Sequence, residues 1–162
     1  MTSTPRLLSH AEKLRRSRQT QAASKAYKNI LDAVPDNTAA LQGMALVSID
    51  AGKLGVAEKW MLRAIQTAPE SAELQTNMCE IYRRLGQYDH AVQYGRRAIS
   101  LAPDSTRSHY NLAIAVADKG DREDAEQIYE SIVEMDPAHN LAWNNLGTCY
   151  AGRADEDAAL GA

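Results

Sequence analysis

The chain has 162 residues, of which 44% are hydrophobic and 24% are charged, and its formal net charge at pH 7 is −3. This composition is typical of a folded chain with a core of its own and argues against a disordered one. The acidic balance argues against a dedicated nucleic-acid-binding protein, and no apolar run approaches the roughly 18 residues of a membrane helix.

The ends and the cysteines indicate a compartment. Residues 1–16 carry charges but no apolar segment of the kind a secretory signal needs. Two cysteines, Cys79 and Cys149, do not make a disulfide framework and are interpreted as small buried residues. We therefore expect a cytoplasmic protein without membrane insertion.

The sequence repeats itself with a fixed period, which is the separation of Pro35 from Pro69. The spacing is kept by four prolines (Pro35, Pro69, Pro103, Pro137) and three glycines (Gly52, Gly86, Gly120). Two columns of small residues keep it as well: Ala11, Ala45, Cys79, Ala113, Gly147 and Ala23, Ala57, Ala91, Ala125, Ala159. A fixed period of this length is typical of repeat architectures.

Each unit is predicted to hold two antiparallel helices. Glycine ends the first helix in a left-handed turn, and proline stops the second. The alanine columns let helices approach closely, and the larger apolar residues bury against the next pair, so stability should come from stacking. The predicted helices are 5–17, 20–34, 38–50, 54–67, 72–85, 88–101, 106–119, 122–135 and 140–151, with a short one at 155–160.

The period resembles the tetratricopeptide repeat, most openly in the run Trp143-Asn144-Asn145-Leu146-Gly147-Thr148-Cys149-Tyr150. The resemblance covers essentially the whole chain and implies an all-α, right-handed superhelical solenoid of antiparallel helix pairs. It implies one domain over 1–162, with repeats at 4–37, 38–71, 72–105, 106–139 and a truncated 140–162. The chain departs from the pattern at Arg18, where the turn glycine is expected, and at Gly95, where an aromatic is expected. The truncation favours a fragment of a longer protein or an interface at the open end.

In that family the first helices of the units line a concave groove. Asn77, Asn111 and Asn145 recur there at the same position of units three to five, whereas Ser9 and Gly43 hold that position in the first two units. The asparagines could pair with the backbone of an extended peptide, as in the superhelix of O-linked N-acetylglucosamine transferase, or they could serve packing alone.

A second groove column alternates in sign through Arg16, Asp50, Arg84 and Asp118. These charges either face a charged peptide or pair with each other across units. Tyr110 is the best aromatic anchor. The other candidate groove residues are Glu80, Arg107, Ile114 and Asn144.

The clamp with which tetratricopeptide domains hold chaperone tails is absent. Its lysine and asparagine positions carry Leu8 with Glu12, Gln42 with Leu46, and Thr76 with Glu80.

No catalytic constellation stands out. The four histidines lie in different units without metal-ligand spacing, and no glycine-rich phosphate loop is present. We therefore expect no enzyme activity, no metal and no cofactor. Paired arginines such as Arg15-Arg16 are interleaved with acids, which favours a solvated surface over nucleic-acid binding.

The sequence thus predicts a non-enzymatic protein–protein interaction module, a scaffold or adaptor that binds a peptide or protein segment in its groove. Two alternatives stay open. One is an N-terminal substrate-recruiting domain of a larger enzyme of the glycosyltransferase or sulfotransferase type. The other is a scaffold that self-associates through its open C-terminal end.

Overall fold

A computed structural model of the chain describes the backbone of residues 3–160 and the side chains of residues 3–152. Within this part the chain forms nine helices and no strand: α1 (Thr4–Arg16), α2 (Thr20–Ala33), α3 (Thr38–Asp50), α4 (Leu54–Thr67), α5 (Ala72–Arg84), α6 (Tyr88–Leu101), α7 (Thr106–Lys119), α8 (Arg122–Met135) and α9 (Asn140–Leu160). The first eight begin and end within one residue of their predicted bounds.

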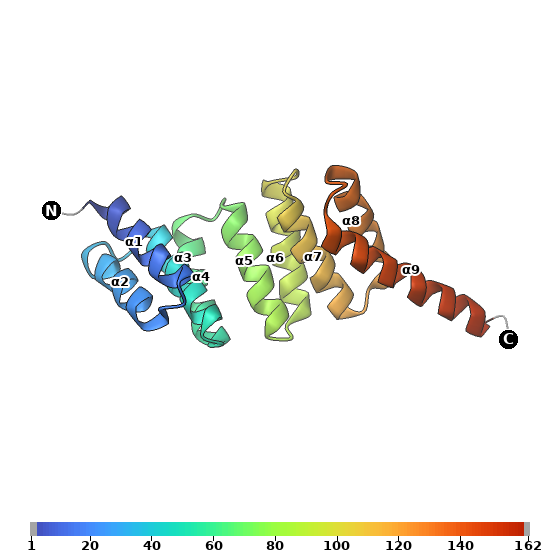
Figure 1. Cartoon of the computed structure of the whole chain (residues 1–162), viewed down its shortest axis with the longest axis horizontal. Coiled ribbons are helices and arrows are strands. Elements are labelled where there is room, and N and C mark those ends of the chain that lie inside the picture. Colours follow the sequence, from blue (N-terminus) through green and yellow to red (C-terminus); the bar gives the residue numbers. More distant parts are fainter. Residues whose placement is uncertain (1–2, 161–162) are drawn as a thin grey trace.

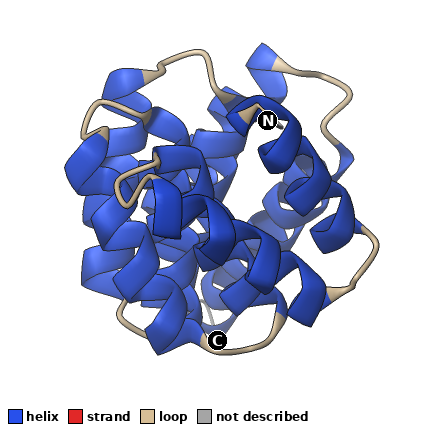
Figure 2. Ribbon diagram, turned by 90° about the vertical axis from the view of Figure 1, so that its left-hand side faces the viewer, coloured by secondary structure: helices blue, strands red, loops and turns tan. Residues whose placement is uncertain are grey.

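Consecutive helices pack against each other in pairs, and the pairs stack along one long axis (Figure 1). Seen from the N-terminal end, the helices surround this axis and the connecting loops lie at the rim (Figure 2). The prediction of an all-α solenoid of antiparallel helix pairs is confirmed.

The turn inside each of the first four units requires a left-handed backbone. Gly52, Gly86 and Gly120 have φ values of 71°, 73° and 103°. Glycine adopts this conformation without a steric penalty, as the column predicted. Arg18 holds the same position in the first unit with a φ of 57°, so the turn is kept there even without glycine.

Side-chain caps start the first helices of units two to four. Asn37 accepts a hydrogen bond from the Ala40 backbone N–H at 2.9 Å. Ser71 and Ser105 do the same for the residues three positions on, at 3.4 and 3.2 Å. Each cap follows a unit-ending proline by two residues and contributes about 1 kcal/mol of helix stability.

The small columns lie in the core. Fully buried are Ala11, Ala45, Cys79, Ala113, Ala23, Ala57, Ala91 and Ala125. Larger side chains such as Leu41, Met61 and Met78, all at 0% exposure, fill the space between successive helices. Gly147 of the fifth unit is exposed, and the side chain of Ala159 lies outside the described residues.

The fifth unit differs from the prediction of two helices. Instead of ending at Ala151, α9 runs from Asn140 to Leu160 without a break and extends away from the stack (Figure 1). Ala154 stands in the column that turns at Arg18 and at the three glycines. Alanine is the strongest helix former and favours continuation there, although Arg18 shows that a residue other than glycine can also take the turn in this column.

Candidate functional site

Charged residues at the ends of α1 and α3 form a network, the first charge cluster (Glu12, Arg15, Arg16, Asp50). The Arg15 guanidinium donates to Glu12 at 2.9 Å and to Asp50 at 3.0 Å. Arg16 donates to Glu12 at 2.7 Å, and the Tyr27 hydroxyl donates to the same carboxylate at 3.0 Å. The hydrogen bonds from Arg15, with help from Arg16 and Tyr27, outweigh burial and lower the pKa of Glu12 from 4.5 to about 2.

The same arrangement returns two units later as the second charge cluster (Glu80, Arg83, Arg84, Asp118). Arg83 donates to Asp118 at 2.9 Å, and Arg84 lies 3.7 Å from Glu80. Arg83 Nε is buried without a hydrogen-bond partner among the described residues. In both clusters the bond across units therefore comes from the arginine before the predicted column, while Arg16 and Arg84 pair within their own helix.

The three column asparagines have different surroundings. Asn77 is 1% exposed, and its Oδ1 accepts from Arg107 at 2.7 Å. Asn111 donates to the backbone carbonyl of Arg107 at 3.0 Å. Asn145 donates to the hydroxyls of Tyr129 and Tyr110 at 3.1 and 3.4 Å. Each amide thus has an intramolecular contact, and Asn111 and Asn145 are half-buried.

The remaining candidates lie on α5, α7 and α9. Tyr110 is half-buried, with its ring centroid 6.2 Å from that of Tyr129 and 5.1 Å from that of His139. Ile114, one turn further along α7, is half-buried, and so is Glu80 on α5. Arg107 and Asn144 are exposed.

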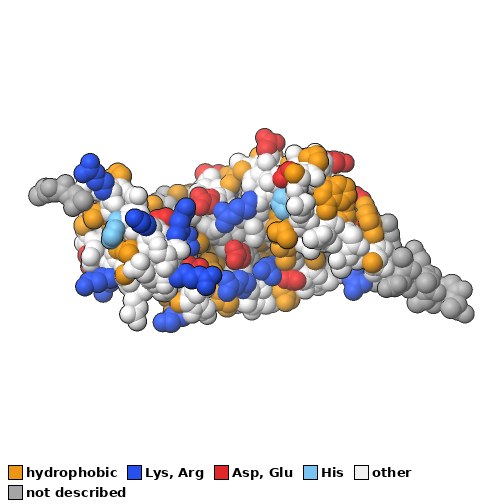
Figure 3. All heavy atoms as spheres, in the orientation of Figure 1, with side chains coloured by type: hydrophobic (Ala, Val, Ile, Leu, Met, Phe, Trp, Pro, Cys, Tyr) orange, Lys and Arg blue, Asp and Glu red, His pale blue; other side chains and the backbone are white. Residues whose placement is uncertain are grey.

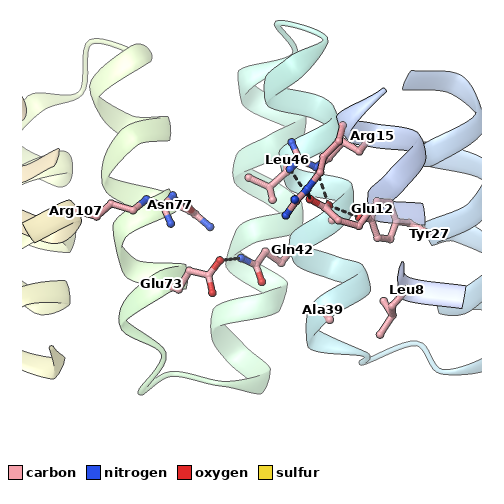
Figure 4. A pocket seen from close by; sticks show the side chains of 12 residues that line it. Leu8, Glu12, Arg15, Tyr27, Ala39, Gln42, Leu46, Glu73, Asn77 and Arg107 are labelled. Atoms are coloured by element: carbon pink, nitrogen blue, oxygen red, sulfur yellow. Dashed lines mark hydrogen bonds and ion pairs between the residues drawn. The ribbon is translucent and has the colours of Figure 1, made fainter. Parts of the chain in front are cut away.

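A cleft of about 500 Å³ opens between α1, α3, α5 and α7. One wall carries Asn77 and Arg107, and the other carries Glu12, Arg15, Arg16 and Tyr27 (Figure 4). A hydrogen bond of 2.6 Å from Gln42 to Glu73 spans the opening (Figure 4). Leu8, Ala39 and Leu46 give the cleft an apolar part. The Nδ2 of Asn77 has no hydrogen-bond partner among the described residues.

The cleft is open because α3 and α5 lack the contacts that join α5 to α7. Across α5 and α7, the hydroxyls of Thr76 and Ser108 form a buried hydrogen bond of 2.9 Å, and the Cys79 thiol donates to the Asn111 carbonyl at 3.6 Å. The equivalent positions of the preceding units hold longer or unmatched side chains: Gln42, Leu74, Ala45 and Asn77. Ile49 and Arg84 hold the positions that correspond to Arg83 and Asp118, and they cannot form an ion pair.

Large hydrophobic side chains are exposed around the start of α9. Leu141 is 58% exposed and Trp143 is 49% exposed. In the space-filling view, hydrophobic side chains gather toward this end of the visible face, whereas most lysine and arginine side chains lie over the remainder (Figure 3). Self-association through this end stays a prediction.

Among the described residues, no group of three histidine, cysteine or acidic side chains is placed to hold a metal ion. No helix in the described range is both long and apolar enough to cross a bilayer. Cys79 and Cys149 are free thiols, and burial raises the pKa of Cys79 to about 12.

Two sequence profiles, both described as tetratricopeptide repeat, match residues 8–72 and 70–138, and together they span most of the chain. The chain belongs to the tetratricopeptide repeat family. Among curated protein sequences none matches this tetratricopeptide repeat protein.

Solved structures share the fold. MamA superposes with a TM-score of 0.81 at 23% identity, covering 93% of this chain and 88% of that one. YrrB, described as a TPR protein with an unusual peptide-binding site, superposes with a TM-score of 0.76 at 22% identity, covering 96% and 80%. A mutant O-GlcNAc transferase of Thermobaculum terrenum has a TM-score of 0.76 at 26% identity, covering 83% of this chain and 27% of that one.

Sequence reasoning missed that Arg15 and Arg83 form the ion pairs between the first helices of neighbouring units, and that Tyr27 donates to Glu12. A signal was present, because an arginine is followed at the same separation by an aspartate in both pairs, Arg15 with Asp50 and Arg83 with Asp118. Whether the first or the second arginine of each pair reaches the aspartate depends on the direction in which its side chain leaves the end of the helix. The position in the repeat alone does not give that direction.

Proposed function

We propose that the protein is a non-enzymatic scaffold that binds a peptide or protein segment along the face formed by α1, α3, α5 and α7. The cleft between α3 and α5 carries this proposal. Its volume of about 500 Å³ is large enough for several side chains of a bound segment.

An exposed hydrogen-bond donor in the cleft supports a polypeptide ligand. Arg107 is exposed, and no carboxylate of the described residues lies within ion-pair distance of it, whereas Arg15, Arg16, Arg83 and Arg84 all have one. The Arg107 guanidinium also donates to Asn77 Oδ1 at 2.7 Å, which fixes it on the wall of the cleft. Backbone carbonyls or carboxylates of a bound segment would accept from the remaining N–H groups of Arg107.

The comparisons favour the same class of function. The repeats of this family build surfaces for protein interaction, and YrrB, similar over almost the whole chain, has a described peptide-binding site. The described residues carry paired charges, amides and one tyrosine hydroxyl in the cleft, and these suit recognition more than bond-making chemistry.

A selection from a library of random twelve-residue peptides tests the proposal. We expect enriched peptides to bind the wild-type protein and to lose at least tenfold in affinity with Arg107→Glu, since a cation in the cleft becomes an anion. Arg97→Glu is the matched control, because Arg97 is an exposed arginine on α6 away from the cleft. Failure to enrich any peptide, or equal binding by both variants, would reject the cleft as the binding site.

A second candidate is a recruiting domain of a larger enzyme. The observation that favours it is the likeness to the O-GlcNAc transferase, in which the matched region makes up 27% of the chain. Reading the gene past the codon for Ala162 tests it. A downstream catalytic domain in the same frame would support this candidate, and a stop codon would remove it.

A further inference from the structure

A second cavity lies outside the cleft, between α2, α3 and α4. It has a volume of about 430 Å³. Its apolar part is formed by Met44, Val47, Val56 and Trp60. Val56 is 44% exposed, so this part of the cavity is open to solvent.

The next interface along the stack explains why the cavity exists. There Tyr82 holds the position that Ser48 holds in the unit before, and its ring fills the corresponding space. The Tyr82 ring stacks on Tyr94 with a centroid distance of 5.4 Å and on His90 at 5.1 Å. At the first interface these two partners correspond to Trp60 and Val56. The cavity is therefore the space of a missing tyrosine ring, and one of its walls is an indole.

The rim of this cavity is basic. Lys25, Lys28 and Lys53 line it and are exposed, and none of them has a described carboxylate within ion-pair distance. No aspartate or glutamate occurs among the described residues that line it. Because these three lysines have no described carboxylate within ion-pair distance, the local charge at the cavity is positive, although the chain as a whole has a net charge of −3.

We propose that this lysine-rimmed cavity is a second docking site, separate from the cleft, for an acidic segment of a partner protein that carries an aromatic side chain. The aromatic ring fills the space that Tyr82 fills in the next unit and stacks on Trp60 as Tyr82 stacks on Tyr94. Aspartate or glutamate side chains on either side of the ring pair with Lys25, Lys28 and Lys53.

The site has a direct test, because the neighbouring unit shows how to close it. Ser48→Tyr copies Tyr82 into the first interface and should fill the cavity from within. Ser48 is 7% exposed, and its hydroxyl donates to the Met44 carbonyl on the same helix, so its replacement breaks no contact between helices. We expect the thermal midpoint of this variant to stay the same or rise.

Binding is measured by fluorescence anisotropy with the full chain and three labelled peptides. The probe has the sequence GSDEFEDSG, and its two controls replace Phe by Ala or the four acids by Lys. We expect the probe alone to bind, and Ser48→Tyr to weaken it at least tenfold. Lys25→Glu with Lys28→Glu should do the same, and the affinity should fall with added salt.

Matched variants show whether the effect belongs to this site. Ser100→Tyr adds the same ring at an exposed serine of α6 that also donates to a backbone carbonyl of its own helix. It should bind the probe like the wild type, and so should Arg107→Glu in the cleft. Binding of the lysine peptide, no binding of the probe, or full binding by Ser48→Tyr would each overturn the proposal. The library selection on the cleft is read separately, so either site can fail without the other.

Discussion

The same charge cluster occurs in the first and third units, but only in the first does a tyrosine hydroxyl add a hydrogen bond to its glutamate. In the first unit the Tyr27 ring lies directly over Gly43, and its hydroxyl reaches Glu12. Two units later Gly95 replaces the tyrosine, and Leu112 fills the space beside it. Without the phenol, Glu80 keeps a looser contact with Arg84, and Arg83 Nε has no partner among the described residues.

The difference shows that one large side chain decides how far a charge network is satisfied. Tyr27 fits because position 43 has no side chain, and the equivalent position in the later unit is Asn111. The first cluster thus combines a tyrosine with a glycine that leaves room for its ring. The second has glycine in place of the tyrosine and asparagine in place of the glycine. Columns that look alike in the sequence therefore have different local roles.

The largest expected effect comes from removing the space for Tyr27. A Cβ on Gly43 would overlap the Tyr27 ring, so Gly43→Ala must displace the ring and its bond to Glu12. We expect a loss of about 2–3 kcal/mol in the free energy of unfolding, measured by urea denaturation. The matched control is Gly147→Ala, because that glycine is also helical and a Cβ there meets nothing within 4 Å. It should gain up to about 1 kcal/mol; a similar loss in both variants would contradict this packing.

The second-largest expected difference between the two clusters is in how each makes the free energy of unfolding depend on pH. The pKa of Glu12 is about 2 in the folded chain, against about 4.3 for an unfolded glutamate. A lowered folded pKa means that the ionised carboxylate stabilises the fold above the unfolded value, and that this stability is lost as pH falls from about 4.5 to 2.

Glu12→Gln should therefore remove part of the acid sensitivity and cost about 1–2 kcal/mol at pH 7, allowing for the solvent that reaches this side chain. Glu80→Gln, the same change in the second cluster, should cost about 0.5 kcal/mol or less, because its one ion pair is long, at 3.7 Å. Thermal unfolding of both variants from pH 2 to 7 measures this. Equal losses would mean that Tyr27 and Arg15 add nothing to the first cluster.

The smallest effects concern the feature that the clusters share. Asp50→Asn and Asp118→Asn each remove one ion pair between units, at 3.0 and 2.9 Å, from carboxylates that are 44% and 40% exposed. We expect each to cost less than about 1 kcal/mol, by similar amounts, and the cost to shrink at high salt. A larger loss for Asp118→Asn alone would show that the orphan Nε of Arg83 makes the second pair more costly to break.

Much of the fold could be predicted because its determinants are local. Turn glycines, stop prolines and alanine columns act on the backbone or on the nearest helix, so their spacing gives the helices to within a residue. The same reasoning failed at α9, where a single alanine in the turn column lets the helix continue. The column of asparagines predicted positions but not surroundings, since the hydrogen-bond partner of Asn77 is Arg107 from the next unit.

Both candidate sites exist because side chains or contacts that fill the equivalent space in a neighbouring unit are missing. The sequence does not reveal such a gap until the packing of the helices is known. The cleft needs Gln42 and Glu73 to face each other across two helices that do not close, and the lysine-rimmed cavity needs Ser48 where a tyrosine would fit. Neither serine nor glutamine is unusual in a helix. Their meaning comes from the neighbouring unit, which supplies a filled version of the same space for comparison.

The two charge clusters lie two units apart, and this spacing limits how such a protein can be lengthened. Its core repeats with every unit, but the arginine–aspartate pairs between the first helices of neighbouring units, Arg15–Asp50 and Arg83–Asp118, lie two units apart. Duplicating one unit would preserve the alanine packing while setting arginine beside arginine or isoleucine beside aspartate. Duplicating two units together would preserve both patterns. For gene duplication, as for an engineer extending the solenoid, the smallest piece that can be copied without conflict is the pair of units.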